Sequence, residues 1–146
     1  MYTAKQTYDR LHSVSSNYAS FQNQFDNFYK SSTRLSETSF PLAGVVFEEI
    51  TPRRQFRASW CGRQLEFRFS IALTEENSMV GIITCVELDP CNDQKVNREV
   101  ERFTFKRNGY LTGIERPADI EDDLEVGCDL AAFYIVCRCF ERTLSK

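Results

Sequence analysis

The sequence predicts an α+β fold with an N-terminal helix, a curved antiparallel meander of about five to six strands, and a C-terminal buried helix packed on the sheet. Apolar residues recur every three or four positions near both ends of the chain, and they alternate with polar residues in between. Short turn signals separate the alternating segments, so neighbouring strands pair antiparallel. We expect one domain, residues 1–146, with a helix at 3–30, the sheet at 43–115 and a helical region at 118–144.

The first helix, residues 3–30, carries an apolar seam whose members step by three and four alternately. The seam consists of Leu11, Val14, Tyr18, Phe21, Phe25 and Phe28. Ser, Asn and Gln occupy most other positions, so this helix needs packing to be stable. Either the aromatic stripe lies across the sheet of the same chain, or part of it, with Tyr18, Phe21, Phe25 and Phe28 as candidates, meets a second copy or another protein. A Ser- and Thr-rich linker is expected at 30–41.

Strands are predicted at 45–50, 55–60 and 64–73, and the last two form a hairpin. A two-residue loop at Cys61-Gly62 places the apolar residues of both strands on one face and sets opposite charges across the other. The predicted pairs are Trp60 with Arg63, Ala58 with Leu65, Phe56 with Phe67, and Arg57 with Glu66. A register shift of one residue would break both the shared apolar face and the pairing of opposite charges.

The second half of the sheet is predicted from one further strand and a second hairpin. The strand covers 79–88, where Val80, Ile82, Val86 and Leu88 recur in phase. The dipeptide Asn108-Gly109 is a strong hairpin signal and joins a strand at 101–106 to one at 110–114.

The C-terminal helix is predicted over 124–144, with a break at Gly127 and an N-cap at Asp129 as the alternative start. One helical face consists of Val126, Leu130, Phe133, Cys137, Phe140 and Leu144. Further apolar residues widen the arc to roughly 200°, more than an ordinary amphipathic stripe. We therefore expect the rest of the protein to cover this helix on most sides.

The net charge of −3 gives no general case for nucleic acid or membrane binding. The distribution of charge is more informative, because residues 53–68 hold five Arg against one Glu and residues 115–129 hold seven acids against one Arg. The arginines follow the polar face and ends of the predicted hairpin. They are the candidate partner-binding residues Arg53, Arg54, Arg57, Arg63 and Arg68.

No catalytic, cofactor or metal site is predicted. The single histidine, His12, lies on the polar side of a helix. A catalytic site that pairs a nucleophile with a histidine would have to use this residue, so such a site is not predicted. The acids and thiols around the 89–93 loop lack the close Cys pairs of structural zinc sites. They are Cys85, Asp89, Cys91 and Asp93. Six cysteines without an apolar leader or a membrane-length apolar stretch indicate reduced thiols in a cytoplasmic protein.

These observations favour a small non-enzymatic protein-interaction module, of an adaptor, chaperone-like or inhibitor-like kind, which binds an acidic partner surface. The alternatives are weak nucleic-acid binding through the arginine-rich sheet face, and a ligand or thiol-enzyme pocket between sheet and helices that uses Cys61 or Cys91. The expected partner is another protein, and a homodimer through the first helix is a further expectation.

Overall fold

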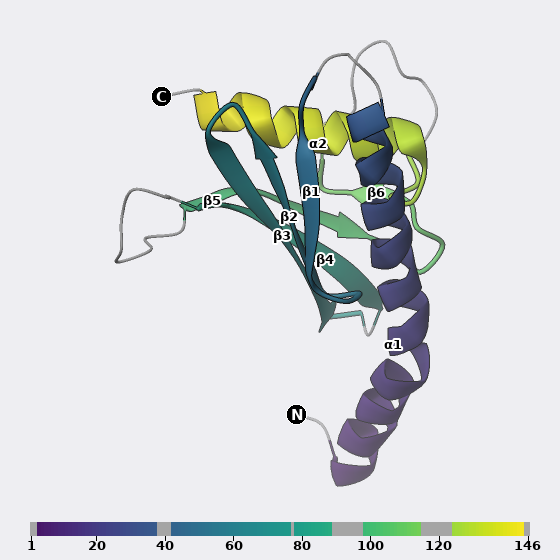
Figure 1. The fold of residues 1–146 in the computed structure, drawn as a ribbon. Helices are drawn as coiled ribbons and strands as arrows, with labels where there is room; N and C mark the ends of the chain where they lie inside the picture. Colours follow the sequence, from purple (N-terminus) through teal and green to yellow (C-terminus); the bar gives the residue numbers. More distant parts are fainter. Residues whose placement is uncertain (1–2, 38–41, 77, 89–97, 115–123, 145–146) are drawn as a thin grey trace.

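The structure, a computed structural model, describes residues 3–37, 42–76, 78–88, 98–114 and 124–144 (Figure 1). One six-stranded antiparallel sheet has its strands in sequence order, and a helix from each end of the chain packs against it. The elements are α1 (Ala4–Thr33), the 3₁₀ helix η1 (Arg34–Glu37), β1 (Val46–Thr51), β2 (Gln55–Trp60), β3 (Arg63–Leu73), β4 (Met79–Leu88), β5 (Arg98–Phe105), β6 (Leu111–Thr112) and α2 (Asp129–Leu144). The predicted α+β fold is confirmed.

Helix α1 begins with a capping box in which Thr3 and Gln6 satisfy each other's backbone N–H groups. Its second half packs three phenylalanines, all at most 1% exposed, onto the sheet. Phe25 and Phe28 contact Phe56 of β2, and Phe21 contacts Phe105 of β5. The first half extends past the sheet (Figure 1), where Tyr8 and Leu11 are 70% and 61% exposed.

The β2–β3 hairpin has the register that its sequence predicts, with Trp60 opposite Arg63 and Arg57 opposite Glu66. Cys61 and Gly62 occupy its two-residue loop with φ angles of 48° and 76°. Positive φ at both loop residues is the geometry of a type I′ turn, whose twist matches that of the flanking strands. The turn therefore fixes which side chains of β2 and β3 face the helices.

We call the helix-covered side of the sheet the inner face, and its centre is aromatic. Phe67 and Phe69 of β3 stack with Phe56 and Phe105 from the neighbouring parts of the sheet. The ring of Phe105 lies directly over Gly81 of β4, where a Cβ would overlap it. Glycine at this position is what makes room for the ring on the inner face.

The second predicted hairpin is present, although β6 is only two residues long. Beyond it, the chain does not enter the helix at residue 124 as the periodicity predicted. Leu124 O accepts a hydrogen bond from Leu111 N at 2.8 Å, and Val126 N donates to Gly109 O at 2.7 Å. Because the backbone of residues 124–126 forms hydrogen bonds with the hairpin, it cannot also be helical, and α2 begins at Asp129.

The face that α2 buries also differs from the predicted one. Leu130 and Leu144 are 54% and 55% exposed, whereas Phe140 is 1% exposed. The buried side consists of Ala131, Ala132, Ile135, Val136, Cys139, Phe140 and Thr143. The apolar arc is wider than one contact surface, and the small residues Ala131 and Ala132 allow the closest approach of neighbouring elements. The exposed leucines therefore lie at the edge of the arc.

The predicted linker at 30–41 is wrong over its described part. Helix α1 continues to Thr33 and passes into η1, in which Leu35 is fully buried. The hydroxyl of buried Ser31 donates to Gly127 O at 2.7 Å and ties this segment to the start of α2. Serine hydroxyls that bond to backbone carbonyls allow a Ser-rich stretch to lie in the interior. Residues 38–41 lie outside the described residues.

Candidate functional site on the outer face of the sheet

The side of the sheet opposite the helices is the outer face, and no described helix lies on it. The helices contact inner-face residues: the ring of Tyr18 lies tilted against that of Phe69, and Phe140 packs edge-on against Trp60. The register places the alternate residues Arg57, Glu66 and Arg68 on the other side. The outer face is thus the broad surface of the sheet that remains for a partner.

A buried carboxylate anchors two arginines on this face. Glu66 is 3% exposed, while the side chains of Arg57 and Arg68 are 35% and 39% exposed. Arg57 Nε donates to Glu66 Oε1 at 3.2 Å, and Arg68 Nη2 donates to Oε2 at 2.6 Å. The trio carries a net charge of +1, and the exposed Glu48 of β1 lies opposite Arg57 on the same face. Because each guanidinium is held at its base, less side-chain entropy is lost when its remaining N–H groups bind an anion.

One rung of the sheet crosses four strands and carries no acidic side chain. Gln55 pairs with Arg68, Arg68 with Thr84, and Thr84 with Arg102 of β5. Arg102 is exposed and forms only an exposed i,i+3 ion pair with Glu99 at 2.8 Å, a type of contact that contributes little stability. The sheet therefore adds Arg102 to the arginines predicted from the hairpin.

Strand β4 lines the middle of the outer face with apolar side chains. Val80, Ile82 and Leu88 are partly exposed, and Val86 is 5% exposed. They alternate with Ile83 and Cys85, which lie on the inner face and are fully buried. Both faces of β4 are thus apolar, although only the inner one is covered by the described helices. The in-phase residues of the sequence do share a face, and it is the outer one.

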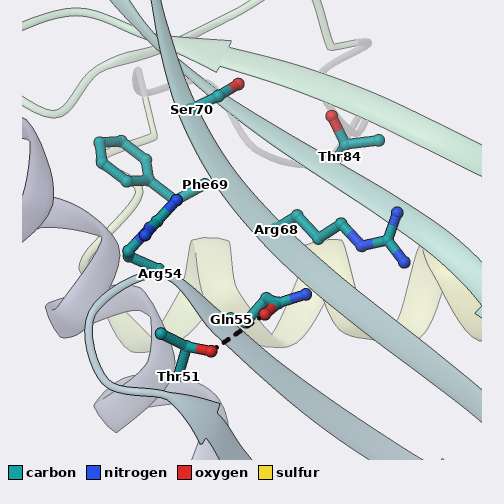
Figure 2. A pocket seen from close by; sticks show the side chains of 7 residues that line it. All are labelled: Thr51, Arg54, Gln55, Arg68, Phe69, Ser70 and Thr84. Atoms are coloured by element: carbon teal, nitrogen blue, oxygen red, sulfur yellow. Dashed lines mark hydrogen bonds between the residues drawn. The ribbon is translucent and has the colours of Figure 1, made fainter.

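A cavity of about 460 Å³ opens beside Arg68. Figure 2 shows Arg68, Gln55 and Thr84 on one side of the β3 ribbon, with the Arg54 guanidinium next to Phe69 on the other side. Arg54 and Arg68 thus line the cavity from different sides of β3. The lining consists of Thr51, Arg54, Gln55, Arg68, Phe69, Ser70 and Thr84. Hydroxyl and amide groups with two guanidiniums make it a polar recess for an anionic group rather than an apolar pocket.

The structure disperses the remaining predicted arginines. Arg53 has a φ of 61° in the β1–β2 turn, next to Arg54, and both are exposed. Arg63 lies at the opposite end of the hairpin, where it binds Glu87 at 3.1 Å and the Thr143 carbonyl at 2.9 Å. Its role is to hold the end of α2. Of the predicted five, Arg57 and Arg68 share the Glu66 carboxylate, and Arg54 and Arg68 line one cavity.

The aromatic seam of α1 is used within the chain. Phe21, Phe25 and Phe28 are buried against the sheet, and Tyr18 is half-buried with its ring 5.8 Å from that of Phe69. These side chains do not offer a free surface for a partner in this conformation.

The predicted ligand pocket between sheet and helices stays a prediction. The crevice between α1 and the β1–β2 turn, next to Phe25 and Phe56, is too small to admit water. Cys61 is exposed in its turn, and Cys91 lies outside the described residues. Burial raises the pKa of Cys139, and contact with Cys85 raises it further. Such thiols are poor nucleophiles near neutral pH.

No family model, curated protein or solved structure matches this chain. Among the described residues there is no cluster of three or more His, Cys, Asp or Glu suited to a metal ion. No described helix combines the length and apolarity of a membrane span.

Proposed function

We propose that the protein is a non-enzymatic interaction module whose outer sheet face binds an acidic segment of another protein. The observation that carries this proposal is the pair of half-exposed arginines, Arg57 and Arg68, fixed on the buried Glu66. Arg102, across Thr84, adds a third positive charge to the same face. Preorganised guanidiniums next to a polar recess recognise carboxylates through charge-assisted hydrogen bonds. A cytoplasmic location belongs to the same proposal.

Weak nucleic-acid binding on this face is the alternative. Sheets that bind single-stranded nucleic acid usually expose aromatic rings for stacking. The described strands β1 to β5 carry no aromatic residue on the outer face, because the phenylalanines of β2, β3 and β5 point to the inner face. The acidic protein segment is therefore favoured, and the test includes a nuclease arm.

The test uses a neutral variant that keeps the shape of the cluster. Reversing Arg57 and Arg68 to Glu would place three carboxylates together around a buried site and unfold the sheet locally. Changing Arg57, Glu66 and Arg68 together to Gln removes the charges but retains hydrogen-bonding groups, and Arg102→Gln completes the variant. The control is Arg34→Gln with Arg142→Gln. Both arginines form ion pairs on the helix side of the molecule, and the side chain of each arginine is at least half exposed.

Tagged wild type, the neutral variant and the control are used to capture partners from native lysate, with and without nuclease. We expect a stoichiometric protein that survives nuclease, is retained by the control and is lost from the neutral variant. The same recovery by all three proteins would exclude the outer face. Recovery that nuclease abolishes and that falls steeply with salt would replace the proposal with nucleic-acid binding.

We also propose a location for a homodimer, on the projecting half of α1 that exposes Tyr8 and Leu11. These residues continue the helical seam that is buried further along α1. A Leu11→Glu substitution should then convert a dimer to a monomer in sedimentation equilibrium at micromolar concentration. A wild-type protein that is already monomeric there would contradict the homodimer without affecting the outer face.

A further inference from the structure

We infer that the segment bound on the outer face is an amphipathic helix that lies along β4, with an apolar stripe on that strand and acidic residues on both flanks. This inference rests on the proposed function and specifies the chemistry and shape of its partner. It follows from three features of the sheet: an apolar row, an arginine on each side of the row, and an open edge, β1, that carries acidic residues.

The apolar row matches the reach of a helix. Strand β4 runs from Met79 to Leu88, and ten residues of strand extend about 33 Å. Val80 and Ile82 lie near one end and Leu88 at the other, all partly exposed. A helix of about 20 residues is roughly 30 Å long, so its apolar stripe would follow this row from end to end.

An arginine flanks the row on each side, and each is in an ion pair with a glutamate, Arg68 with Glu66 and Arg102 with Glu99. Arg68 lies one strand to one side of Thr84 on β4, and Arg102 lies one strand to the other. Two strand spacings separate the backbones of Arg68 and Arg102 by about 10 Å, which is about the diameter of a helix with its side chains. A helix seated on β4 would therefore have a guanidinium along each flank. Acidic residues on both sides of its apolar stripe would meet these charges.

An extended acidic segment would add to the sheet at an open edge. One edge is β1, which neighbours β2 alone and presents the exposed residues Glu48 and Glu49. Like charges on an added acidic strand would oppose pairing there. The other edge is the part of β5 outside the two residues that pair with β6, and a strand added at either edge would not cover the apolar row on β4. The apolar row therefore favours a helix on the face over a strand at an edge.

The probe is a designed 20-residue helical peptide with leucines at positions spaced by three and four, flanked by glutamates. A control peptide has the same composition with the leucines permuted off one face, and a second replaces the glutamates with lysines. Binding to the full-length protein is measured by fluorescence anisotropy, and the site is mapped by shifts of backbone amide resonances. The protein variants are Ile82→Lys, the milder Ile82→Thr, and Arg102→Glu. The control is Leu144→Lys, at an exposed position of α2.

We expect the striped acidic peptide to bind at least tenfold more tightly than either control peptide and to shift resonances of β4. Ile82→Lys and Arg102→Glu should each weaken binding at least tenfold, Ile82→Thr less, and Leu144→Lys not at all. Equal binding of the striped and permuted acidic peptides, lost in the neutral arginine variant, would overturn the helix and leave the proposed function standing. Resonance shifts confined to β1, or to the open edge of β5, would identify strand addition instead. No binding of any peptide would overturn the inference, while the lysate experiment decides the proposed function independently.

Discussion

The two faces of this sheet differ in what their side chains contact. On the inner face, aromatic rings from the strands and α1 pack on one another, with Phe56 and Phe67 stacked at 4.9 Å between centroids. On the outer face, a single buried carboxylate holds two arginines beside an apolar row that no described helix covers. The inner face therefore carries the stability of the fold, and the outer face is left with the groups suited to binding.

The largest effect should come from truncating an inner-face ring. Phe67 is fully buried between Phe28 and Phe56, so Phe67→Ala should lower the free energy of unfolding by about 3–5 kcal/mol. Ser70→Ala, on the outer face of the same strand and exposed, should change it by no more than about 0.5 kcal/mol. Chemical denaturation measures both, and equal losses would contradict the division between the faces.

A smaller loss is expected from adding one methyl group at Gly81. The new Cβ would overlap the ring of Phe105, so Gly81→Ala should cost about 1–3 kcal/mol. Shortening the ring by Phe105→Leu should return part of that loss in the double variant. Strict additivity of the two substitutions in a double-mutant cycle would show that the ring and the glycine do not interact.

Removing the carboxylate under the arginines should have a still smaller effect on stability. Glu66→Gln loses charge-assisted hydrogen bonds to Arg57 and Arg68, but both guanidiniums are about a third exposed or more and regain water. We expect a loss of about 1–2 kcal/mol, discounted for that exposure. The control Asp129→Asn removes an exposed ion pair with Arg34 and should be nearly neutral. Equal effects of the two substitutions would show that burial of Glu66 does not matter.

The smallest predicted effect depends on pH and arises from α2. Burial raises the pKa of Cys137 from 9.0 to about 11, and the neighbouring Cys139 adds to the rise. The fold thus favours the neutral thiol, so this contribution is complete below pH 9 and is lost as the pH rises from 9 towards 11. Cys137→Ala should show a shallower decline in melting temperature over that range. An unchanged decline would assign the alkaline loss to other groups, such as Tyr29, whose pKa burial also raises.

The hairpins could be predicted from the sequence because local chemistry determines them. Cys61-Gly62 and Asn108-Gly109 specify tight turns, and a one-residue slip of the first would expose Phe56 and Phe67. The buried face of α2 could not be predicted in the same way. Its apolar arc allows more than one orientation, and packing chose the side with Ala131 and Ala132. Helical periodicity also could not reveal that residues 124–126 pair with the hairpin.

Only part of the candidate site could be predicted from the sequence. The pairing of Arg57 with Glu66 follows from the hairpin register alone. The place of Arg102 depends on two further strand registers and on a bulge between Cys85 and Val86, which no local motif indicates. The side of β4 was ambiguous because Ile82 and Ile83 are equally apolar neighbours, and alternation cannot tell which of the two is core.

This ambiguity supplies the most direct test of the account, a comparison of Ile82→Lys and Ile83→Lys by thermal unfolding. Ile83 is fully buried on the inner face, whereas Ile82 is partly exposed on the outer face, where a lysine can extend into water. We predict that Ile82→Lys keeps a cooperative transition within a few degrees of wild type, and that Ile83→Lys abolishes the folded state. A folded Ile83→Lys, or an Ile82→Lys that unfolds to the same extent, would contradict the assignment of the inner face to the core and of the outer face to the exposed surface.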